Sequence, residues 1–470
     1  MTHEDKLDAD GIRDDGVPYY KADAQRLQSY VDARAELSEF DAPVFVHANN
    51  PREYLYVASF DGTGNDKFKD PAHETNVGKI DDQIEALRLS GNEHIDRGYV
   101  PGPGTEDAFL ARTFDGMNGR TYDARVEEMY KKFTDQAWRW KQADPDAQIR
   151  VVDIGFSRGS DQAAGFARIV QERGIQDPMG AHYTYDSHHR ITHVEYTRPP
   201  LIEPGQVAQA VGLFDPVGTG DPVKHHDRRL PPSVISGIQI TAADERRGLF
   251  KSDRIIDPGM TPDGRFLGVT VAGAHSDVGG SYHRDGLAIR SENLMVDYLN
   301  GLSDRPFLQR QAAPDDPRLD VVHRSEDGML LYRLAPKVDR LSHDGYNELL
   351  VPKSEAKQVA DPLNAEPRDE SLNKQFQRQR IDTGMQPVLP DQPQQAPSCV
   401  LSAQLDRLLA AGQSNDWGAF SRENGMLAFG EAGRGMLANA VAQASWLEQQ
   451  PMPQAVHQQA VQPAGPAMSF

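Results

Sequence analysis

The stretch Ile149-Arg150-Val151-Val152-Asp153-Ile154-Gly155-Phe156-Ser157-Arg158-Gly159 decides the fold of this chain. Its β-branched run at 151–154 predicts a strand, and the residues that follow, 160–173, have the pattern of a helix. A strand, the pattern G-x-S-x-G and a helix in this order indicate a nucleophile elbow. The two glycines permit a turn tight enough to expose the Ser157 hydroxyl on strained backbone. A five-residue pattern of this kind also arises by chance, so its meaning depends on the rest of the chain.

Composition limits the classes of function that the chain can have. Its 470 residues can form one large α/β domain with additions. The formal net charge of -20 argues against nucleic acid as the main partner, and it restricts contact with an anionic membrane to local patches. The single cysteine, Cys399, excludes a disulfide framework and a cysteine-based metal site. No signal-peptide pattern or membrane-spanning run is visible, so we expect synthesis in the cytoplasm and, for secretion, a specialised export machine.

Strand and helix patterns alternate along the first three quarters of the chain. Further strands are predicted at 54–60, 98–100, 207–214, 236–242 and 265–272. Helices are predicted at 22–38, from Thr75 to about Ser90, at 124–142 and at 292–301. This alternation predicts an α/β-hydrolase-like fold, in which helices cover both faces of a mostly parallel sheet.

The chain divides into four predicted regions. Residues 1–50 form an N-terminal arm, 51–360 the hydrolase domain, 361–399 a linker, and 400–470 a helical segment, with helices at 402–411 and 435–449, and a Gln- and Pro-rich tail. A polar insertion at 180–209 interrupts the domain. Its histidines, His182, His188, His189 and His193, match no standard metal-site spacing, so we expect a mobile loop over the pocket. We expect neither a metal nor a cofactor.

Three residue types that form a catalytic triad follow predicted strands in the required chain order. A serine needs a base to remove its proton, and the base is usually a histidine oriented by a carboxylate. Ser157, Asp215 and His275 each come directly after an apolar strand. Because parallel strands end at one edge of the sheet, these three side chains can converge there. An alternative assignment pairs Asp277 with His343.

An acyl-transfer intermediate also needs backbone N–H donors around its oxyanion. We expect one donor from Arg158, the residue after the nucleophile, and another from Gly62 or Thr63 in the loop after the first strand. The Asp61 carboxylate is expected to point away from the oxyanion and to brace this loop. Asp61, Asp277 and Arg246 are assigned to substrate binding. Arg246 belongs to a basic cluster that can meet a phosphate headgroup, although a solvated surface is the ordinary explanation for such a cluster.

Seven blocks of this chain, in order, resemble the signature of the DUF2235 α/β-hydrolases, a family that includes the Tle1-like phospholipase effectors of bacterial type VI secretion. The blocks are Phe60-Asp61-Gly62-Thr63-Gly64-Asn65, Thr75-Asn76-Val77, Pro101-Gly102-Pro103-Gly104-Thr105, Gly155-Phe156-Ser157-Arg158-Gly159, Gly212-Leu213-Phe214-Asp215-Pro216-Val217-Gly218, Asp244-Glu245-Arg246-Arg247, and Gly273-Ala274-His275-Ser276-Asp277-Val278-Gly279-Gly280-Ser281-Tyr282. The chain departs from the pattern at Pro216, where threonine is usual, and at Ala274.

The resemblance implies a serine-dependent phospholipase, A1 or A2, that hydrolyses acyl esters of bacterial membrane glycerophospholipids, with Ser157, Asp215 and His275 on the triad positions. It also implies a secreted antibacterial effector that acts in the target-cell periplasm or at its membrane, with a cognate immunity protein and a secretion-apparatus component as partners. The Gln-rich C-terminus is similar in composition to the tails of type IV secretion effectors. Two alternatives stay open: a general serine esterase or acyltransferase on a soluble ester, and a non-catalytic hydrolase-like binding module.

Overall fold

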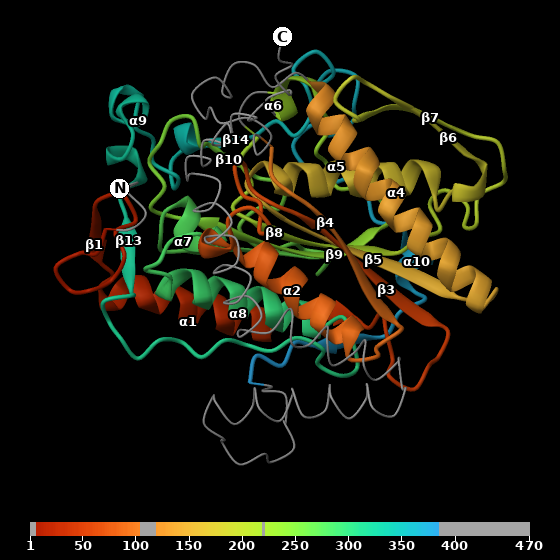
Figure 1. Ribbon diagram of the computed structural model, residues 1–470, viewed down its shortest axis with the longest axis horizontal. Coiled ribbons are helices and arrows are strands. Elements are labelled where there is room, and N and C mark those ends of the chain that lie inside the picture. Colours follow the sequence, from red (N-terminus) through yellow and green to blue (C-terminus); the bar gives the residue numbers. More distant parts are fainter. Residues whose placement is uncertain (1–5, 104–118, 219–220, 385–470) are drawn as a thin grey trace, which may run out of the picture. The chain divides into compact units, whose positions relative to one another are not determined.

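A seven-stranded sheet forms the centre of the computed structural model, which describes residues 6–103, 119–218 and 221–384 (Figure 1). Its strand order is β11-β12-β9-β8-β5-β3-β4. All neighbours are parallel except β11, which pairs antiparallel with β12 at one edge. The strands are β3 (Glu53–Phe60), β4 (Ile95–Val100), β5 (Gln148–Phe156), β8 (Gln209–Phe214), β9 (Val234–Ala242), β11 (Gly259–Met260) and β12 (Phe266–Val271).

The central strands are apolar on both faces because helices cover both faces of a parallel sheet. Every residue of β3 and β8 is buried, and β5 is buried from its second residue onward. The register aligns the strand ends: Phe60 lies opposite Gly155, and Phe156 lies opposite Phe214. The loops that carry Asp61, Ser157 and Asp215 therefore leave the sheet side by side.

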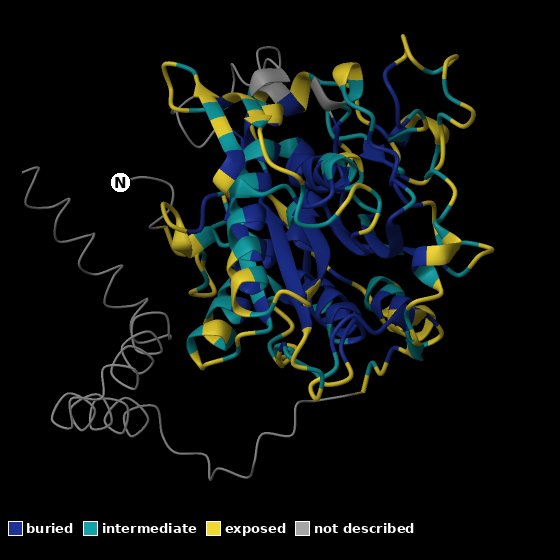
Figure 2. Cartoon of the chain, turned by 90° about the vertical axis from the view of Figure 1, so that its right-hand side faces the viewer, coloured by how far each residue is buried: buried dark blue, intermediate teal, exposed yellow. Residues whose placement is uncertain are grey.

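Two helical layers enclose the sheet, and Figure 2 shows the strands buried between them. One layer packs on the face that carries Leu55, Val57 and Ile154, and the other on the face that carries Tyr56, Ala58 and Val151. The first layer contains α1 (Ala24–Ser38), α2 (Asn76–Leu89) and α8 (Gly286–Asn300); the second contains α4 (Gly119–Ala143) and α5 (Arg158–Arg173). The α/β-hydrolase-like class and the predicted core strands and helices are confirmed, with ends that differ by a few residues.

Segments outside the predicted domain pack onto the same body. β1 (Tyr19–Lys21) pairs with β13 (Val321–His323), and β2 (Asp41–Pro43) pairs with β15 (Arg378–Arg380). The described part of the predicted linker thus supplies β15, together with α10 (Glu370–Asn373). All described residues fall in one compact unit, Met1–Gln394. The helices predicted at 402–411 and 435–449, and the tail, lie outside the described residues.

The insertion at 180–209 is a hairpin and not a mobile loop over the pocket. Its strands β6 (Ala181–Tyr185) and β7 (Ile191–Tyr196) pair antiparallel, and β7 packs on α4. Tyr196 packs against the buried α4–α5 core, and Ile191 is buried as well. The prediction was wrong because the four histidines masked the alternating pattern of two short strands.

Short elements complete the loops around the strand ends. They are α6 (Asp221–His225), α7 (His275–Gly279), α9 (Leu330–Leu334), β10 (Ser252–Asp253), β14 (Tyr346–Asn347), and the 3-10 turns η2 (Pro71–His73), η3 (Pro178–Gly180), η4 (Ser325–Asp327) and η5 (His343–Gly345). Within the described part of the chain, no helix is long and apolar enough to cross a bilayer.

Candidate active site

Ser157 occupies a strained turn between β5 and α5. Its backbone has φ 59° and ψ -127°, a conformation that L-residues rarely adopt. The strain persists because the turn is fixed: Ser157 N–H donates to the Phe214 carbonyl at 3.0 Å, and Gly159 packs against the Phe60 and Asp61 carbonyls so closely that a Cβ would collide with them. The geometry is that of the predicted nucleophile elbow, with Ser157 directly before the N-terminus of α5.

His275 and Asp215 form a short hydrogen bond at the same edge of the sheet. His275 Nδ1 lies 2.5 Å from Asp215 Oδ2, and both side chains are buried. We assign the proton to Nδ1, because Asp215 is an ionised acceptor, so Nε2 carries the lone pair that a general base needs. Burial lowers the pKa of His275 below 6.5, an effect that the neighbouring Asp215 only partly offsets.

A buried arginine that the sequence did not single out fixes Asp215. Arg340 donates from Nη1 to Asp215 Oδ1 and from Nη2 to Asp215 Oδ2, at 2.8 and 3.0 Å. Ala242 N–H donates to Asp215 Oδ1 at 3.0 Å. Burial raises the pKa of Asp215, but Arg340 and His275 outweigh it and hold the pKa at about 2. Asp215 is therefore an ionised carboxylate, and each of its oxygens accepts a hydrogen bond from a group other than His275.

A second buried ion pair supports His275 from its backbone side. Glu245 Oε2 accepts from the His275 N–H at 3.2 Å and from Arg247 Nη2 at 2.8 Å. Burial raises the pKa of Glu245, but Arg247 outweighs it and brings the pKa to about 2. The Phe156 and Phe250 rings lie 4.5 and 5.1 Å from the imidazole. These contacts leave the imidazole few alternative orientations.

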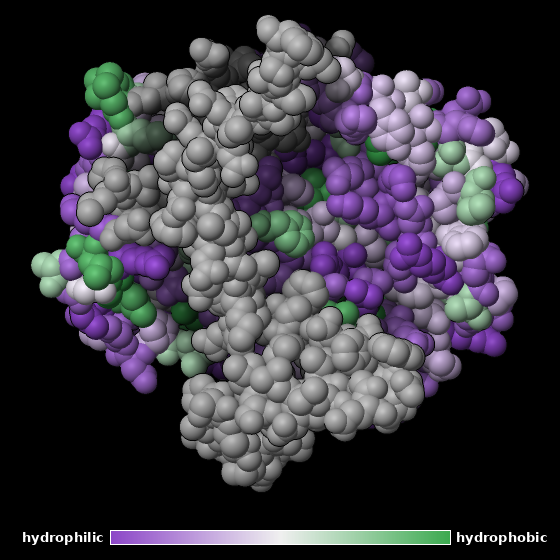
Figure 3. All heavy atoms as spheres, viewed as in Figure 1, coloured by the Kyte–Doolittle hydropathy of each residue, from purple (hydrophilic) through white to green (hydrophobic). Residues whose placement is uncertain are grey.

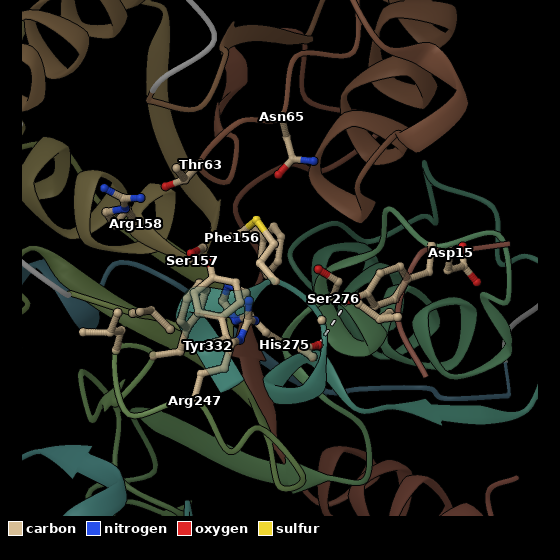
Figure 4. Close-up of a pocket in the computed structure, with 18 residues that line it drawn as sticks. Asp15, Thr63, Asn65, Phe156, Ser157, Arg158, Arg247, His275, Ser276 and Tyr332 are labelled. Atoms are coloured by element: carbon tan, nitrogen blue, oxygen red, sulfur yellow. Dashed lines mark hydrogen bonds between the residues drawn. The ribbon is translucent and has the colours of Figure 1, made fainter. Parts of the chain in front are cut away.

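Ser157 and His275 face one cavity of about 400 Å³ (Figure 4). In this view Thr63 and Arg158 lie on one side of Ser157, and Arg247 and Tyr332 lie on the other side. Apolar and polar side chains share its wall, as they do in sites for amphipathic ligands. The lining residues are Asp15, Val17, Thr63, Asn65, Phe156, Ser157, Arg158, Val217, Arg247, Leu249, Phe250, His275, Ser276, Tyr282, Ser325, Gly328, Met329 and Tyr332.

The three expected oxyanion donors are not equivalent in the structure. Gly62 N–H donates to Asp61 Oδ1 at 2.7 Å, so this donor is occupied. Thr63 lines the cavity, and within the described residues neither its N–H nor its buried hydroxyl has a hydrogen-bond partner. Arg158 is the first residue of α5, a position at which the backbone N–H has no acceptor within the helix. Thr63 and Arg158 therefore stay the expected donors, and the engaged N–H of Gly62 gives that residue no support as a donor.

Asp61 braces the loop that carries Thr63. It accepts from Gly62 N–H, from Thr75 Oγ1 at 2.7 Å and from Tyr99 Oη at 2.5 Å. Burial raises the pKa of Asp61 to about 6 against these donors. The carboxyl is absent from the cavity wall, so the geometry gives no support to the substrate contact expected of it.

The other two residues assigned to substrate binding also lie outside the cavity wall. Asp277 is buried and accepts from Ala274 N–H and from His323 N–H, at 2.8 and 2.9 Å. Arg246 is exposed, whereas its neighbour Arg247 is buried and lines the cavity. The cavity geometry therefore does not support a substrate contact by Arg246, and nothing in the sequence distinguishes the inward side of this turn from the outward side.

The alternative pairing of Asp277 with His343 is wrong. Asp277 Oδ1 lies 2.5 Å from Nδ1 of His323, whose Nε2 lies 3.1 Å from Asp15. His343 is exposed and pairs with Glu348. Burial lowers the pKa of His323, but Asp277 and Asp15 outweigh it and raise the pKa to about 9. His323 therefore carries a structural charge behind the cavity.

Arg340, Glu245 and Asp15 are the site residues that sequence reasoning missed. Glu245 stands inside a quoted motif, and its place beside Arg247 was a usable signal. Arg340 and Asp15 follow no strand and belong to no motif, so only the folded chain brings Arg340 to Asp215 and Asp15 to the cavity wall. Among the described residues, no cluster of three or more His, Cys, Asp or Glu side chains could hold a metal ion.

Comparisons with known proteins agree with the motifs. Residues 56–201 match the family model of the type VI secretion phospholipase effector Tle1-like catalytic domain. That segment contains Ser157 but ends before Asp215. No curated protein matches the chain by sequence.

Solved structures with partial similarity include the Tle1 effector bound to the VgrG spike from the type 6 secretion system. The match is 19% identical, covers 51% of this chain and 52% of that chain, and has a TM-score of 0.28. A lipase/esterase from Lactobacillus plantarum is 13% identical over 49% of this chain and 85% of that chain, with a TM-score of 0.23. The RedJ thioesterase from Streptomyces coelicolor is 12% identical over 53% and 94%, with a TM-score of 0.21. The chain thus aligns with about half the length of the Tle1 effector.

The predicted resemblance is confirmed by the family model: over residues 56–201, which include the elbow serine, this chain is similar to the catalytic domain of the Tle1-like phospholipase effectors.

Proposed function

We propose that this chain is a serine-dependent phospholipase A that hydrolyses acyl esters of bacterial membrane glycerophospholipids. The single observation that carries the proposal is the elbow Ser157 in one cavity with His275, whose Nδ1 lies 2.5 Å from Asp215. The family match over residues 56–201 supports a phospholipid as the substrate class.

In the first step Ser157 Oγ attacks the acyl carbonyl carbon while His275 Nε2 takes the hydroxyl proton. Asp215 orients the imidazole and stabilises its charged form. The N–H groups of Thr63 and Arg158 hold the oxyanion. Collapse of the intermediate breaks the ester bond, and His275 returns the proton to the leaving lysophospholipid oxygen. Water, deprotonated by His275, then attacks the acyl-serine, releases the fatty acid and restores Ser157.

The wall of the cavity suits an amphipathic substrate. Phe156, Leu249, Phe250 and Met329 provide an apolar surface for the acyl chain. Arg247 and Arg158 provide positive charge for the phosphate of the leaving half. Burial lowers the pKa of Arg158 to about 10, which still leaves it cationic at neutral pH.

The biological setting is part of the same proposal. The chain acts as a secreted antibacterial effector in the target-cell periplasm or at its membrane, and a cognate immunity protein protects the producer. The Tle1 effector of known structure is bound to a VgrG spike, which supports a spike component of a type VI apparatus as the delivery partner. The Gln-rich tail leaves a type IV coupling protein as the other candidate partner.

Mass spectrometry of products from a phospholipid with different sn-1 and sn-2 chains tests the reaction. The wild-type protein is expected to release one fatty acid and the matching lysophospholipid, and the identity of the acid assigns A1 or A2 specificity. Ser157→Ala is expected to release neither, whereas the control Ser354→Ala, at an exposed serine outside the cavity wall, behaves as wild type. Hydrolysis of a soluble short-chain ester without release from phospholipid would instead favour a general esterase.

A further inference from the structure

The α9 helix presents large apolar side chains to solvent. Leu330 and Leu334 are 70% and 78% exposed, Met329 is 47% exposed, and Leu341, in the turn that follows, is 70% exposed. We call these residues the α9 patch. Leu330 and Leu334 are four positions apart and therefore share one face of the helix. Hydrophobic surface gathers at the upper left of Figure 3, where Figure 1 places α9.

This helix is fixed from beneath. Tyr332, on its opposite side, is 6% exposed and meets the Phe250 ring at 5.7 Å. Two backbone hydrogen bonds join the following segment to the turn before Phe250: Gly248 N–H to the Pro336 carbonyl and Val338 N–H to the Arg246 carbonyl, both at 2.9 Å. The contacts of Tyr332 and these hydrogen bonds therefore hold α9 in place, with Leu330 and Leu334 exposed on its outer side.

The patch is continuous with the catalytic cavity. Gly328, Met329 and Tyr332 line the cavity that also contains Ser157 and His275. An occupant of the outer face of α9 thus lies next to the part of the cavity wall that Met329 forms. Continuous apolar surface between the two lets an acyl chain pass from one to the other without full exposure to water.

The charges around the patch differ from those of the whole chain. The segment 324–341 has three exposed basic residues and three acidic residues, although the chain carries a formal charge of -20; its fourth basic residue, Arg340, is buried against Asp215. Asp327 pairs with Arg324 and Lys337. Arg324, Arg333 and Lys337 are exposed around the leucines. A leucine face bordered by Arg and Lys is the pattern of elements that lie in a membrane interface, where the cations meet lipid phosphates.

We propose that the α9 patch docks this chain on the surface of a phospholipid bilayer. Leu330 and Leu334 enter the acyl region, while Arg333 and Lys337 meet the phosphates. The inference rests on the proposed function, because docking there delivers the ester to the cavity. It adds a membrane-binding surface that is separate from the catalytic residues. The surface is small and bordered by cations, so it can bind a bilayer although the whole chain is acidic.

Vesicle binding by full-length protein in a Ser157→Ala background tests the surface without hydrolysis. The vesicles contain phosphatidylethanolamine and phosphatidylglycerol, and bound protein is measured by co-sedimentation. Leu330→Ser/Leu334→Ser is expected to weaken binding by about tenfold or more, because each change removes most of an inserted leucine. The matched control Val31→Ser/Leu363→Ser changes side chains that are 58% and 43% exposed and lie outside the cavity wall, and its binding is expected to match the parent protein.

With Ser157 restored, the ratio of vesicle hydrolysis to soluble-ester hydrolysis is expected to fall by about tenfold in the α9 double variant. Vesicle binding by the double variant equal to that of the parent overturns the proposal, as does a parent protein that does not bind vesicles. Unchanged vesicle binding with loss of a dimer assigns the face to a second copy and also overturns it. Phospholipid hydrolysis that persists in Ser157→Ala contradicts the proposed function alone, since binding is measured independently.

Discussion

Arg340 clamps both carboxylate oxygens of Asp215, with Nη1 at 2.8 Å from Oδ1 and Nη2 at 3.0 Å from Oδ2. Both side chains are completely buried. The carboxylate that orients His275 is thus itself positioned by a guanidinium 125 residues further along the chain. A bidentate pair of this kind fixes the plane of the carboxylate as well as its charge.

Arg340→Met is expected to lower the free energy of unfolding by about 3–5 kcal/mol, because it leaves Asp215 buried without its counter-ion. It should also move the acid limb of kcat/KM to higher pH, since the pKa of Asp215 rises and His275 loses a nearby cation. Denaturant unfolding and a pH–rate profile measure the two effects.

Arg340→Lys keeps the charge and should recover part of both losses. Arg88→Met, at an exposed arginine paired with Glu85, is the control and should change neither. If Arg340 only stabilises the fold, Arg340→Met will lower the free energy of unfolding without moving the acid limb of kcat/KM. That result would contradict a role of Arg340 in positioning Asp215.

The activity of the wild-type protein should rise with pH through a limb centred below pH 6.5. Burial lowers the pKa of His275 from 6.5, so the neutral imidazole that accepts the serine proton is present at slightly acidic pH. kcat/KM on a soluble short-chain ester, measured from about pH 4 to pH 8, reports this group in the free enzyme. An acid limb centred above neutrality would contradict the assignment.

His323→Gln should weaken the fold at neutral pH and leave it less sensitive to alkali. The pKa of His323 is raised from 6.5 to about 9, so its charged form stabilises the fold fully below pH 6.5, and this contribution disappears as pH rises through about 9. The contribution is on the order of 3 kcal/mol. Unfolding at about pH 6 and about pH 10 should show the difference between variant and wild type shrinking. His343→Gln, at a histidine that is 79% exposed, is the control.

Gly159→Ala should lower activity by about 100-fold by displacing the elbow. A Cβ there would collide with the Phe60 and Asp61 carbonyls, so α5 must move away from β3. Displacing the nucleophile by about 1 Å costs about 100-fold in rate, and the melting temperature should fall as well. Gly384→Ala meets only the mobile end of the Asp382 side chain and should be silent in both assays. Wild-type activity in Gly159→Ala would show that the turn tolerates another shape.

Local sequence patterns were sufficient to predict the strands of the sheet and the order in which Ser157, Asp215 and His275 follow them. The strands before Asp61, Ser157 and Asp215 are buried on both faces. Strands of this kind appear in the sequence as nearly uninterrupted runs of apolar residues. Parallel strands end at the same edge of a sheet. The positions of Ser157 and His275, each directly after a strand, were therefore enough to predict that they lie together.

Partners from distant segments could not be predicted in the same way. Arg340 and Asp15 reach the site from loops, where no periodicity relates residue number to direction. Asp277 was assigned to substrate binding, yet the turn of α7 directs its carboxylate to His323, 46 residues away. The sequence left Gly62 and Thr63 as alternative donors, and only the structure shows that the Gly62 N–H already donates to Asp61.

Labelling with a fluorophosphonate probe tests the central claim most directly, because the probe reacts only with a serine activated by its neighbours. Peptide mass mapping is expected to place one adduct on Ser157, and His275→Gln is expected to slow labelling by about 100-fold or more. An unlabelled wild-type protein, or an adduct on a different serine, would contradict the account.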